Sequence, residues 1–283
     1  MNGIHVLGEH DHDRFAAYCR FVRAVFPRAG FERWIEWGEW DDSYRAFALF
    51  EGERIVANAS LTRMRLLLDG AECRAWQFGA VGVVPECRGR GYSDQVMAAA
   101  LAACGDDPAL LFANPQVTRF YPRFGFQPLS ESIFGIDFVC APGAPAPSLD
   151  AAQPAARALI RELAASLPST RRFGACGHGR IISWYLANGF AAAPRQLDGD
   201  SLVLCHVDGD CLHIDDILAR RPFDLVAAIP ALIDSPIRQI RFGFTPDVWW
   251  PDAQMLGVNA DALLFVRGLK PPAPHRFPRL AET

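Results

Sequence analysis

The chain has 283 residues, of which 51% are hydrophobic and 21% are charged, a balance typical of a globular protein with a sizeable core. Its 28 basic and 32 acidic side chains give a formal net charge of −4, which excludes a general electrostatic attraction to nucleic acid. No apolar run approaches the ~20 residues that a membrane-spanning helix needs, and the first residues lack the basic and then apolar pattern of a signal peptide. We therefore expect a cytoplasmic protein with no nucleic-acid or membrane partner.

Eight cysteines are scattered along the chain, at positions 19, 73, 87, 104, 140, 176, 205 and 211. Reduced thiols are expected, because no Cys-x-x-Cys pair occurs and several cysteines stand among apolar residues, as buried free thiols do. Cysteines and histidines lie close in sequence between positions 176 and 213, but the Cys-x₂₋₄-Cys spacing of a structural zinc site is missing. No metal site is predicted.

The first 84 residues have the pattern of two helices followed by two pairs of strands. Apolar side chains recur at helical spacing over residues 13–26, and a second, short helix is expected over 31–37. Apolar runs then predict strands at 44–50, 54–61, 64–68 and 73–84. The dipeptide Asp69-Gly70 between two of these runs is a strong hairpin signal.

A loop with two glycines follows, between a strand and a helix. Pro85 ends the strand because proline cannot donate to a sheet ladder, and after Ser93 the apolar residues fall on one face of a helix. Glycines let the backbone approach a ligand, and a helix start presents unpaired N–H groups with a partial positive charge. With Arg88 and Arg90 beside it, this loop is typical of an anion site, and phosphate is the usual anion.

The details of this loop distinguish between several ligand classes. A dinucleotide-binding loop would need a third glycine where Asp94 stands, and a P-loop would end in Gly-Lys-Ser/Thr, which is absent. The remaining pattern, Arg88-x-x-Gly91-x-Ser93, resembles the pyrophosphate loop of the GCN5-related N-acetyltransferase (GNAT) family. An ordinary strand-to-helix turn with exposed arginines is the alternative, since short motifs carry false positives.

A second motif supports the resemblance. The sequence Tyr121-Pro-Arg-Phe-Gly-Phe-Gln-Pro128 is similar to the Tyr-x-x-x-Gly-Phe helix end of the same family, and more narrowly to its enhanced-intracellular-survival branch. The stretch between the two motifs accommodates a helix, a strand at 109–113 and a short second helix.

The order of elements is similar to the GNAT fold up to a last strand at 134–140, after which the chain becomes rich in proline and alanine. Beyond it, helices, a hairpin, a helix and two strands are expected at 155–167, 181–186, 201–218, 223–233, 237–244 and 262–267. The prediction is an α/β protein with mixed sheets. It comprises a catalytic GNAT domain over 1–140, a Pro/Ala linker over 141–150 and a degenerate second GNAT-like domain over 151–283, which lacks a cofactor loop.

The resemblance implies that acetyl-CoA is the cofactor. It places the pantetheine arm against backbone groups of Val81 and Val83. The pyrophosphate would lie on the backbone N–H groups of Arg88, Gly89, Arg90, Gly91, Tyr92 and Ser93. Asn114, after the next strand, either meets the pantetheine arm or forms a turn before Pro115.

The resemblance also implies two catalytic groups. Tyr121 stands where the family keeps a general acid, and a tyrosine with a pKa near ~10 can donate a proton to the leaving thiolate; its alternative role is a core aromatic. In the resembled branch the terminal carboxylate helps to accept the amine proton, a role that would fall to Thr283. The tail carries Phe277, Leu280 and two prolines, so we expect it to dock, either for catalysis or only to tie the domains together.

The acceptor pocket is expected near Trp34, Glu36 and Trp37, because aromatic rings and carboxylates suit a cationic amine; the two tryptophans are alternatively core residues. The predicted function is direct transfer of an acetyl group from acetyl-CoA to a primary amine of a small molecule or a protein. A non-catalytic acyl-CoA sensor and a nucleotide-binding regulatory domain are the alternatives, and Tyr121 in its expected place favours catalysis over both. The pattern gives no indication of the oligomeric state.

Overall fold

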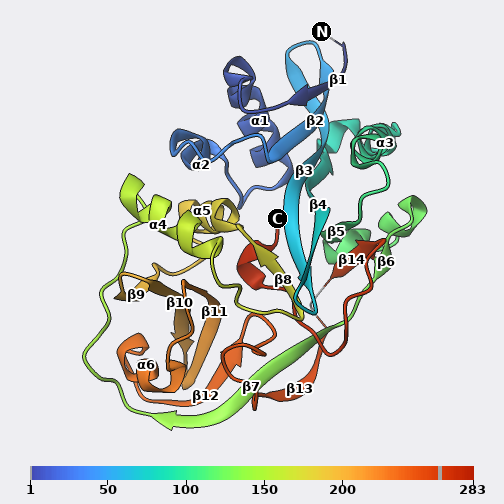
Figure 1. Ribbon diagram of the computed structural model, residues 1–283. Helices are drawn as coiled ribbons and strands as arrows, with labels where there is room; N and C mark the ends of the chain where they lie inside the picture. Colours follow the sequence, from blue (N-terminus) through green and yellow to red (C-terminus); the bar gives the residue numbers. More distant parts are fainter. Residues whose placement is uncertain (1, 261–262) are drawn as a thin grey trace.

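A long hairpin forms the centre of the first sheet. The computed structural model describes residues 2–260 and 263–283 (Figure 1). In it, β3 (Arg54–Leu68) and β4 (Ala71–Val83) pair antiparallel. Asp69 and Gly70 join them with positive φ angles of 49° and 80°, as a two-residue hairpin turn requires. The predicted hairpin is confirmed, but the strands expected at 54–61 and 64–68 are one continuous strand.

The neighbouring strands extend this hairpin on both sides. β2 (Tyr44–Glu51) and β1 (Asn2–Leu7) continue the sheet antiparallel beyond β3, whereas β5 (Ala109–Phe112) lies parallel to β4. β1 was not predicted, because a short edge strand carries little periodic signal and its pairing with β2 decides its conformation.

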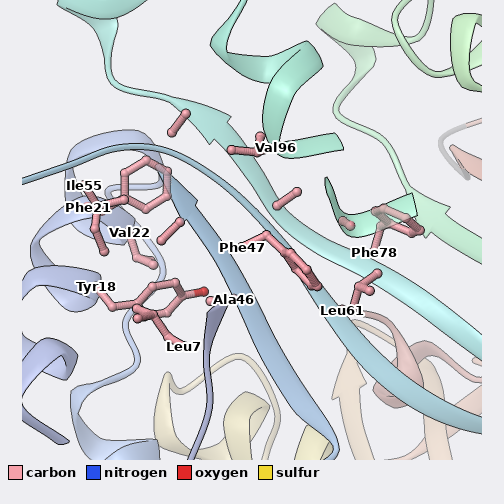
Figure 2. Packing of buried hydrophobic residues seen from close by; sticks show 14 of the residues in the cluster. Leu7, Tyr18, Phe21, Val22, Ala46, Phe47, Ile55, Leu61, Phe78 and Val96 are labelled. Atoms are coloured by element: carbon pink, nitrogen blue, oxygen red, sulfur yellow. The ribbon is translucent and has the colours of Figure 1, made fainter. Parts of the chain in front are cut away.

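Helices cover both faces of the first sheet. α1 (His12–Val25) and α3 (Tyr92–Cys104) pack against the same strands, and Figure 2 shows Tyr18 of α1 on one side of them and Val96 of α3 on the other. Every residue from Ala46 to Phe50 is buried, which a strand achieves only when both of its faces are covered. The helices predicted at 13–26, at 31–37 and after Ser93 are confirmed to within a few residues, including the short α2 (Glu32–Glu36). The short helix expected after the strand at 109–113 is wrong, because the described chain forms only 3₁₀ turns there.

The second sheet repeats part of this arrangement. β10 (Ser201–Asp208) and β11 (Cys211–Ala219) form a hairpin, α6 (Leu225–Leu232) follows, and β12 (Ile237–Phe242) returns parallel to β11, as β5 does to β4. The segment before α6 has no glycine; Asp224 caps the helix by accepting a hydrogen bond from the Ala227 N–H at 3.0 Å. β9 (Arg195–Asp198), which was not predicted, completes one edge.

The two sheets exchange strands. β7 (Glu131–Cys140) lies between β12 and β13 (Gln254–Asn259) in the six-stranded second sheet, so the expectation that it ends the first sheet is wrong. Instead β14 (Leu264–Arg267) enters the first sheet between β5 and β6 (Gln127–Pro128). Periodicity predicts that a segment is a strand but not its partner, because pairing depends on residues far away in the sequence. The expected strand start at Ala262 lies outside the described residues.

The second half of the chain also reaches β3 directly. β8 (Phe173–Cys176) pairs with the last residues of β3, beyond the part of β3 that pairs with β2. This strand was not predicted. The helices α4 (Pro154–Ala164) and α5 (Gly179–Ala187) flank it (Figure 1). Short 3₁₀ turns lie in the connections at η1 (Pro85–Cys87), η2 (Pro115–Val117) and η3 (Tyr121–Phe124), and in the tail at η4 (Arg279–Ala281). None of the described helices combines the length and apolar character needed to cross a bilayer.

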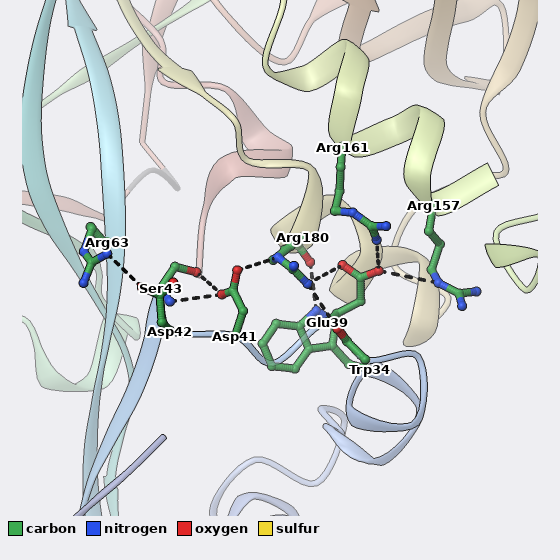
Figure 3. A network of polar contacts seen from close by, with 10 residues as sticks. Trp34, Glu39, Asp41, Asp42, Ser43, Arg63, Arg157, Arg161 and Arg180 are labelled. Carbon is green, nitrogen blue, oxygen red and sulfur yellow. Dashed lines mark hydrogen bonds and ion pairs between the residues drawn. The ribbon is translucent and has the colours of Figure 1, made fainter. Parts of the chain in front are cut away.

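A buried carboxylate joins the two halves. Glu39 is fully buried between α2 and β2, and the guanidinium groups of Arg157, Arg161 and Arg180 from α4 and α5 surround it (Figure 3). Arg180 also binds Asp41 through its Nε at 2.7 Å. A buried charge is tolerated only when it is paired and hydrogen-bonded, so these arginines fix α4 and α5 against the first sheet.

We predict that Glu39→Ala destabilises the protein by ~3–5 kcal/mol, because three arginines would lose the charge they surround. The matched control is Glu36→Ala on the exposed side of the same segment, which should change the free energy of unfolding by no more than ~0.5 kcal/mol. Chemical denaturation monitored by tryptophan fluorescence measures both. Equal stabilities for the two variants would contradict the role given to Glu39.

Candidate active site

A cavity of about 600 Å³ lies between the first sheet and the start of α5. The first sheet contributes Gly79 and Val81 from β4 to its wall, and α2 contributes Trp34. The second half of the chain contributes His178 and Trp184. The cavity therefore exists only where the two halves meet.

The glycine loop stands at the surface, directly after β4. Gly89 and Gly91 have φ angles of 78° and 75°, and a Cβ added to either would meet no atom within 4 Å. Gly91 is the N-cap of α3, whose first N–H groups have no partner within the helix. Arg88 and Arg90 are exposed beside it, and Tyr92 donates a hydrogen bond to Glu51 at 2.5 Å. Arg90 lies 3.9 Å from the Glu51 carboxylate, and Arg88 donates to the Val83 carbonyl at 3.4 Å. The open backbone and the two exposed guanidinium groups fit a phosphate group.

β4 has a bulge where it borders the cavity, at which its pairing with β3 shifts register. Ala80 has a φ of 46°, and the buried Asn58 holds its carbonyl oxygen with a hydrogen bond of 3.0 Å. The parallel pairing of β4 with β5 ends at Phe78, so the strands part before Val81 and Asn114, which both line the cavity. Val83 pairs with β3 and lies outside the cavity lining.

Asn114 has the turn-forming role that was one of its two alternatives. Its side-chain oxygen accepts a hydrogen bond from the Gln116 N–H at 3.0 Å, which caps η2. The residue is exposed and lines the cavity, so the other alternative, contact with a pantetheine arm, is not excluded by this bond.

Tyr121 lies in the cavity wall at the start of η3. The residue is buried, and burial raises its pKa to about 12. Among the described residues its hydroxyl has no hydrogen-bond partner, although buried tyrosines usually find one. The hydroxyl is therefore protonated at neutral pH and free to donate.

The C-terminal tail docks into the molecule, as predicted, and its end lies in the middle of the structure (Figure 1). Phe277, Leu280 and Ala281 are fully buried. The side chain of Gln77 on β4 donates to the Ala281 carbonyl at 2.8 Å and accepts from the Thr283 N–H at 3.0 Å. Thr283 consequently lines the same cavity as Tyr121.

The last residue lies directly on the bulged strand. A Cβ built on Gly79 would stand 3.0 Å from the Thr283 hydroxyl and 3.4 Å from its carboxyl carbon. Glycine at this position thus makes room for the chain end.

Glu282 brings a second carboxyl group to the cavity. Its pKa is raised to about 8, chiefly by burial and also by the nearby Glu131, while Arg276 and Arg279 act in the opposite direction. Among the described residues, neither this carboxyl group nor the terminal one forms an ion pair. At neutral pH the terminal carboxylate is therefore the anionic group available to a cation, and Glu282 is largely protonated.

The three residues expected to bind the acceptor are not brought together. Trp34 lines the cavity, and its ring N–H donates to the Arg180 carbonyl at 2.8 Å. Trp37 instead packs against the Arg157 guanidinium, 4.8 Å from the ring centroid, and Glu36 is exposed in a separate groove. These three residues lie within about one helical turn, but side chains at successive helical positions point in different directions.

The part of the cavity wall that comes from the second half of the chain was not predicted. Glu282 could have been found from the docked tail, since it precedes Thr283. His178 and Trp184 had no such signal, because only the packing of α5 against the first sheet brings them to the cavity.

Comparison with known proteins identifies the first part of the chain. The family model described as an acetyltransferase (GNAT) domain matches residues 5–129. This part of the chain is similar to a GNAT domain. The assignment covers β1 to β6 and includes the glycine loop and Tyr121, and it supports acyl transfer as the general chemistry of this domain.

Solved structures similar to the chain extend over both halves. A probable N-acyltransferase from Enterococcus faecalis V583 has a TM-score of 0.60 at 13% identity, covering 94% of this chain and 72% of the other. Eis1 from Mycobacterium abscessus has a TM-score of 0.53 at 18% identity, covering 93% and 73%. A putative acetyltransferase from Pyrococcus horikoshii has a TM-score of 0.53 at 14% identity, covering 100% and 97%. At these identities the similarity shows a shared fold. No curated protein sequence matches the chain significantly.

The raised pKa of Glu282 predicts a pH dependence of stability. Between its ordinary value of 4.5 and about 8, the folded protein holds a proton that the unfolded chain has lost. This contribution to stability is therefore complete below pH 4.5 and is lost as the pH rises through about 8.

Glu282→Gln, which stays neutral, should flatten the fall in stability over this range, as measured by urea denaturation at a series of pH values. The matched control is Glu53→Gln, at an exposed turn, which should retain the slope of the native protein. Identical slopes for Glu282→Gln and the native protein would contradict the assigned pKa.

Proposed function

We propose that the protein transfers an acetyl group directly from acetyl-CoA to a primary amine. The observation that carries this proposal is that the free hydroxyl of Tyr121 and the chain end at Thr283 line one cavity, at the point where β4 and β5 part. An acid and an anionic group in one cavity suit a reaction that removes protons from an amine and gives one to a thiolate.

The residues present fit a CoA-type donor. Backbone N–H groups from Arg88 to Ser93 would hold the pyrophosphate, with the exposed side chains of Arg88 and Arg90 beside them. The pantetheine arm would lie between Val81 and Asn114, where β4 and β5 are no longer paired. Val83 is the last residue of β4 before the glycine loop. When bound, the donor supplies a thioester as the electrophile.

Tyr121 is assigned the role of general acid. Because burial raises its pKa to about 12, the hydroxyl stays protonated throughout the neutral range. It would donate its proton to the sulfur as the carbon–sulfur bond breaks, since a positioned acid stabilises the departing thiolate.

The acceptor side of the cavity suits a cation. The terminal carboxylate of Thr283 has no ion-pair partner among the described residues, and Phe31, Trp34 and Trp184 line the adjoining wall. Carboxylates attract an ammonium group, and aromatic faces stabilise it. The terminal carboxylate is assigned the role of attracting the amine and helping to remove its proton; Glu36 and Trp37 have no assigned role.

We also propose that the chain works as a catalytic domain over 1–140, a linker over 141–150 and a second, GNAT-like domain over 151–283 that provides one wall of the acceptor pocket. The repeated hairpin, helix and parallel strand of the second sheet support this division. The partners are thus a small-molecule acyl donor and an amine acceptor. A non-catalytic acyl-CoA sensor is the alternative, and it would need neither a free Tyr121 hydroxyl nor a docked chain end.

CoA should protect the fold against heat. At a hundred times its dissociation constant it should add ~2.7 kcal/mol of stability, measured as a shift of the melting temperature. Gly91→Val should abolish the shift, because the side chain would be strained at the positive φ and would occupy the open space of the loop.

The matched control for Gly91→Val is Gly209→Val, at a positive φ of 61° in the hairpin of the second sheet. This variant should carry similar strain and keep the protection by CoA. If adenine or nicotinamide nucleotides protect the protein and CoA does not, the cofactor assignment is wrong.

Tyr121→Phe should leave CoA affinity nearly intact and lower the rate of acetyl transfer by ~10²–10⁴-fold. Thiol release in single-turnover experiments with a panel of primary amines measures the rate. Tyr44→Phe removes a hydroxyl from the same cavity, one that bonds to Tyr18 at 2.5 Å, and should affect stability without a comparable loss of rate. An unchanged rate for Tyr121→Phe would remove it from the mechanism.

The chain end can be tested by extension as well as by deletion. Adding two glycines after Thr283 moves the carboxylate but keeps the contacts of Gln77, whereas deleting 281–283 removes both. We expect both variants to lose transfer activity while CoA still protects the extended one. Full activity in both would leave the tail only a structural role.

A further inference from the structure

A histidine from the second half of the chain stands in the wall of the cavity. His178 precedes α5 and is only 4% exposed. Its ring Nε2 lies 2.7 Å from a carboxylate oxygen of Asp216 on β11, which is fully buried. Imidazole and carboxylate thus form a buried pair at the boundary between the second sheet and the cavity.

The surroundings of Asp216 fix the orientation of this pair. Its other oxygen accepts a hydrogen bond from the Ile217 N–H at 2.9 Å, so the carboxylate cannot turn freely. An ionised carboxylate only accepts hydrogen bonds, and Nε2 must therefore carry the proton that binds Asp216. This leaves a lone pair on Nδ1, in the arrangement by which a carboxylate orients a catalytic histidine.

That lone pair is not used by the protein. Nδ1 of His178 is buried and has no hydrogen-bond partner among the described residues. The side chain does not cap α5, although the residue occupies the N-cap position. Leaving a buried polar group unpaired is costly, and neither helix capping nor packing requires a lone pair here.

We propose that His178, oriented by Asp216, binds the amine acceptor through Nδ1 and takes its proton. This inference rests on the proposed function. The chain end attracts the amine, and His178 is the group that takes its proton. The ammonium group gives one proton to Nδ1, directly or through one water, which frees the lone pair of its nitrogen. That nitrogen then bonds to the thioester carbon, and its second proton passes to the solvent through the terminal carboxylate. The carbon–sulfur bond breaks, and the sulfur receives its proton from Tyr121.

The neighbouring charges leave this role to His178. Arg161 and Arg180, from the two helices packed here, both bind Glu39. The terminal carboxylate of the tail lines the same cavity and has no ion-pair partner among the described residues. Imidazole is the side chain that ordinarily changes charge around neutral pH, so it can both accept and return a proton there.

The first test compares His178→Gln with His275→Gln. His275 is equally buried and also has an unpaired ring nitrogen, but it is not among the residues that line the cavity. With acetyl-CoA and 1,6-diaminohexane, His178→Gln should lower kcat/KM by ~10²-fold or more and abolish its decline toward acidic pH. His275→Gln should keep the rate and the pH profile. A native pH profile in His178→Gln would overturn the proposal while leaving acyl transfer intact.

A second test needs no activity. In the native protein labelled with ¹⁵N-histidine, Nε2 of His178 should be protonated and Nδ1 unprotonated, and 1,6-diaminohexane should shift the Nδ1 resonance. A protonated Nδ1 in the free protein, or no shift at millimolar diamine, would overturn the proposal. A shift without any acetyl transfer would support His178 as an amine ligand and contradict the proposed function.

Discussion

The arrangement of this protein depends on a single buried carboxylate. Glu39 is completely shielded from water, and its ion-pair partners in the described part of the chain are three arginines from α4 and α5 (Figure 3). Because an unpaired charge at this depth is costly, α5 cannot leave the first sheet without exposing or neutralising Glu39. The cavity between α5 and the bulged β4 is a consequence of this constraint.

Strand exchange strengthens the same association. β7 leaves the first half of the chain for the second sheet, and β14 returns from the second half to cover β5. The chain then continues into the tail, whose end is held by the side chain of Gln77 on β4. Neither sheet is complete without the other half, so the GNAT domain over 5–129 cannot be regarded as an independent unit with an appendage.

The candidate catalytic groups accordingly come from three distant parts of the sequence. Tyr121 belongs to the GNAT domain, His178 to the start of α5, and Thr283 to the chain end, yet all three line one cavity. The buried surroundings act on each differently. Burial raises the pKa of Tyr121 and keeps it an acid, and it leaves Nδ1 of His178 without a partner. In the proposed mechanism the proton donor lies in the first half of the chain and the proton acceptors lie in the second half. The two halves must then stay packed together for the reaction to occur.

Local sequence determined the elements that depend on neighbouring residues. Asp69-Gly70 specified the hairpin, the positive φ of Gly91 suited the loop before α3, and helical spacing gave α1 and α3. Tyr121 and the docking of the tail also followed from short motifs. Tertiary structure alone decided that β7 and β14 exchange sheets, that Trp34 faces the cavity while Glu36 does not, and that His178 meets Asp216. These outcomes depend on burial and on pairing between residues far apart in the chain, and no local pattern encodes them.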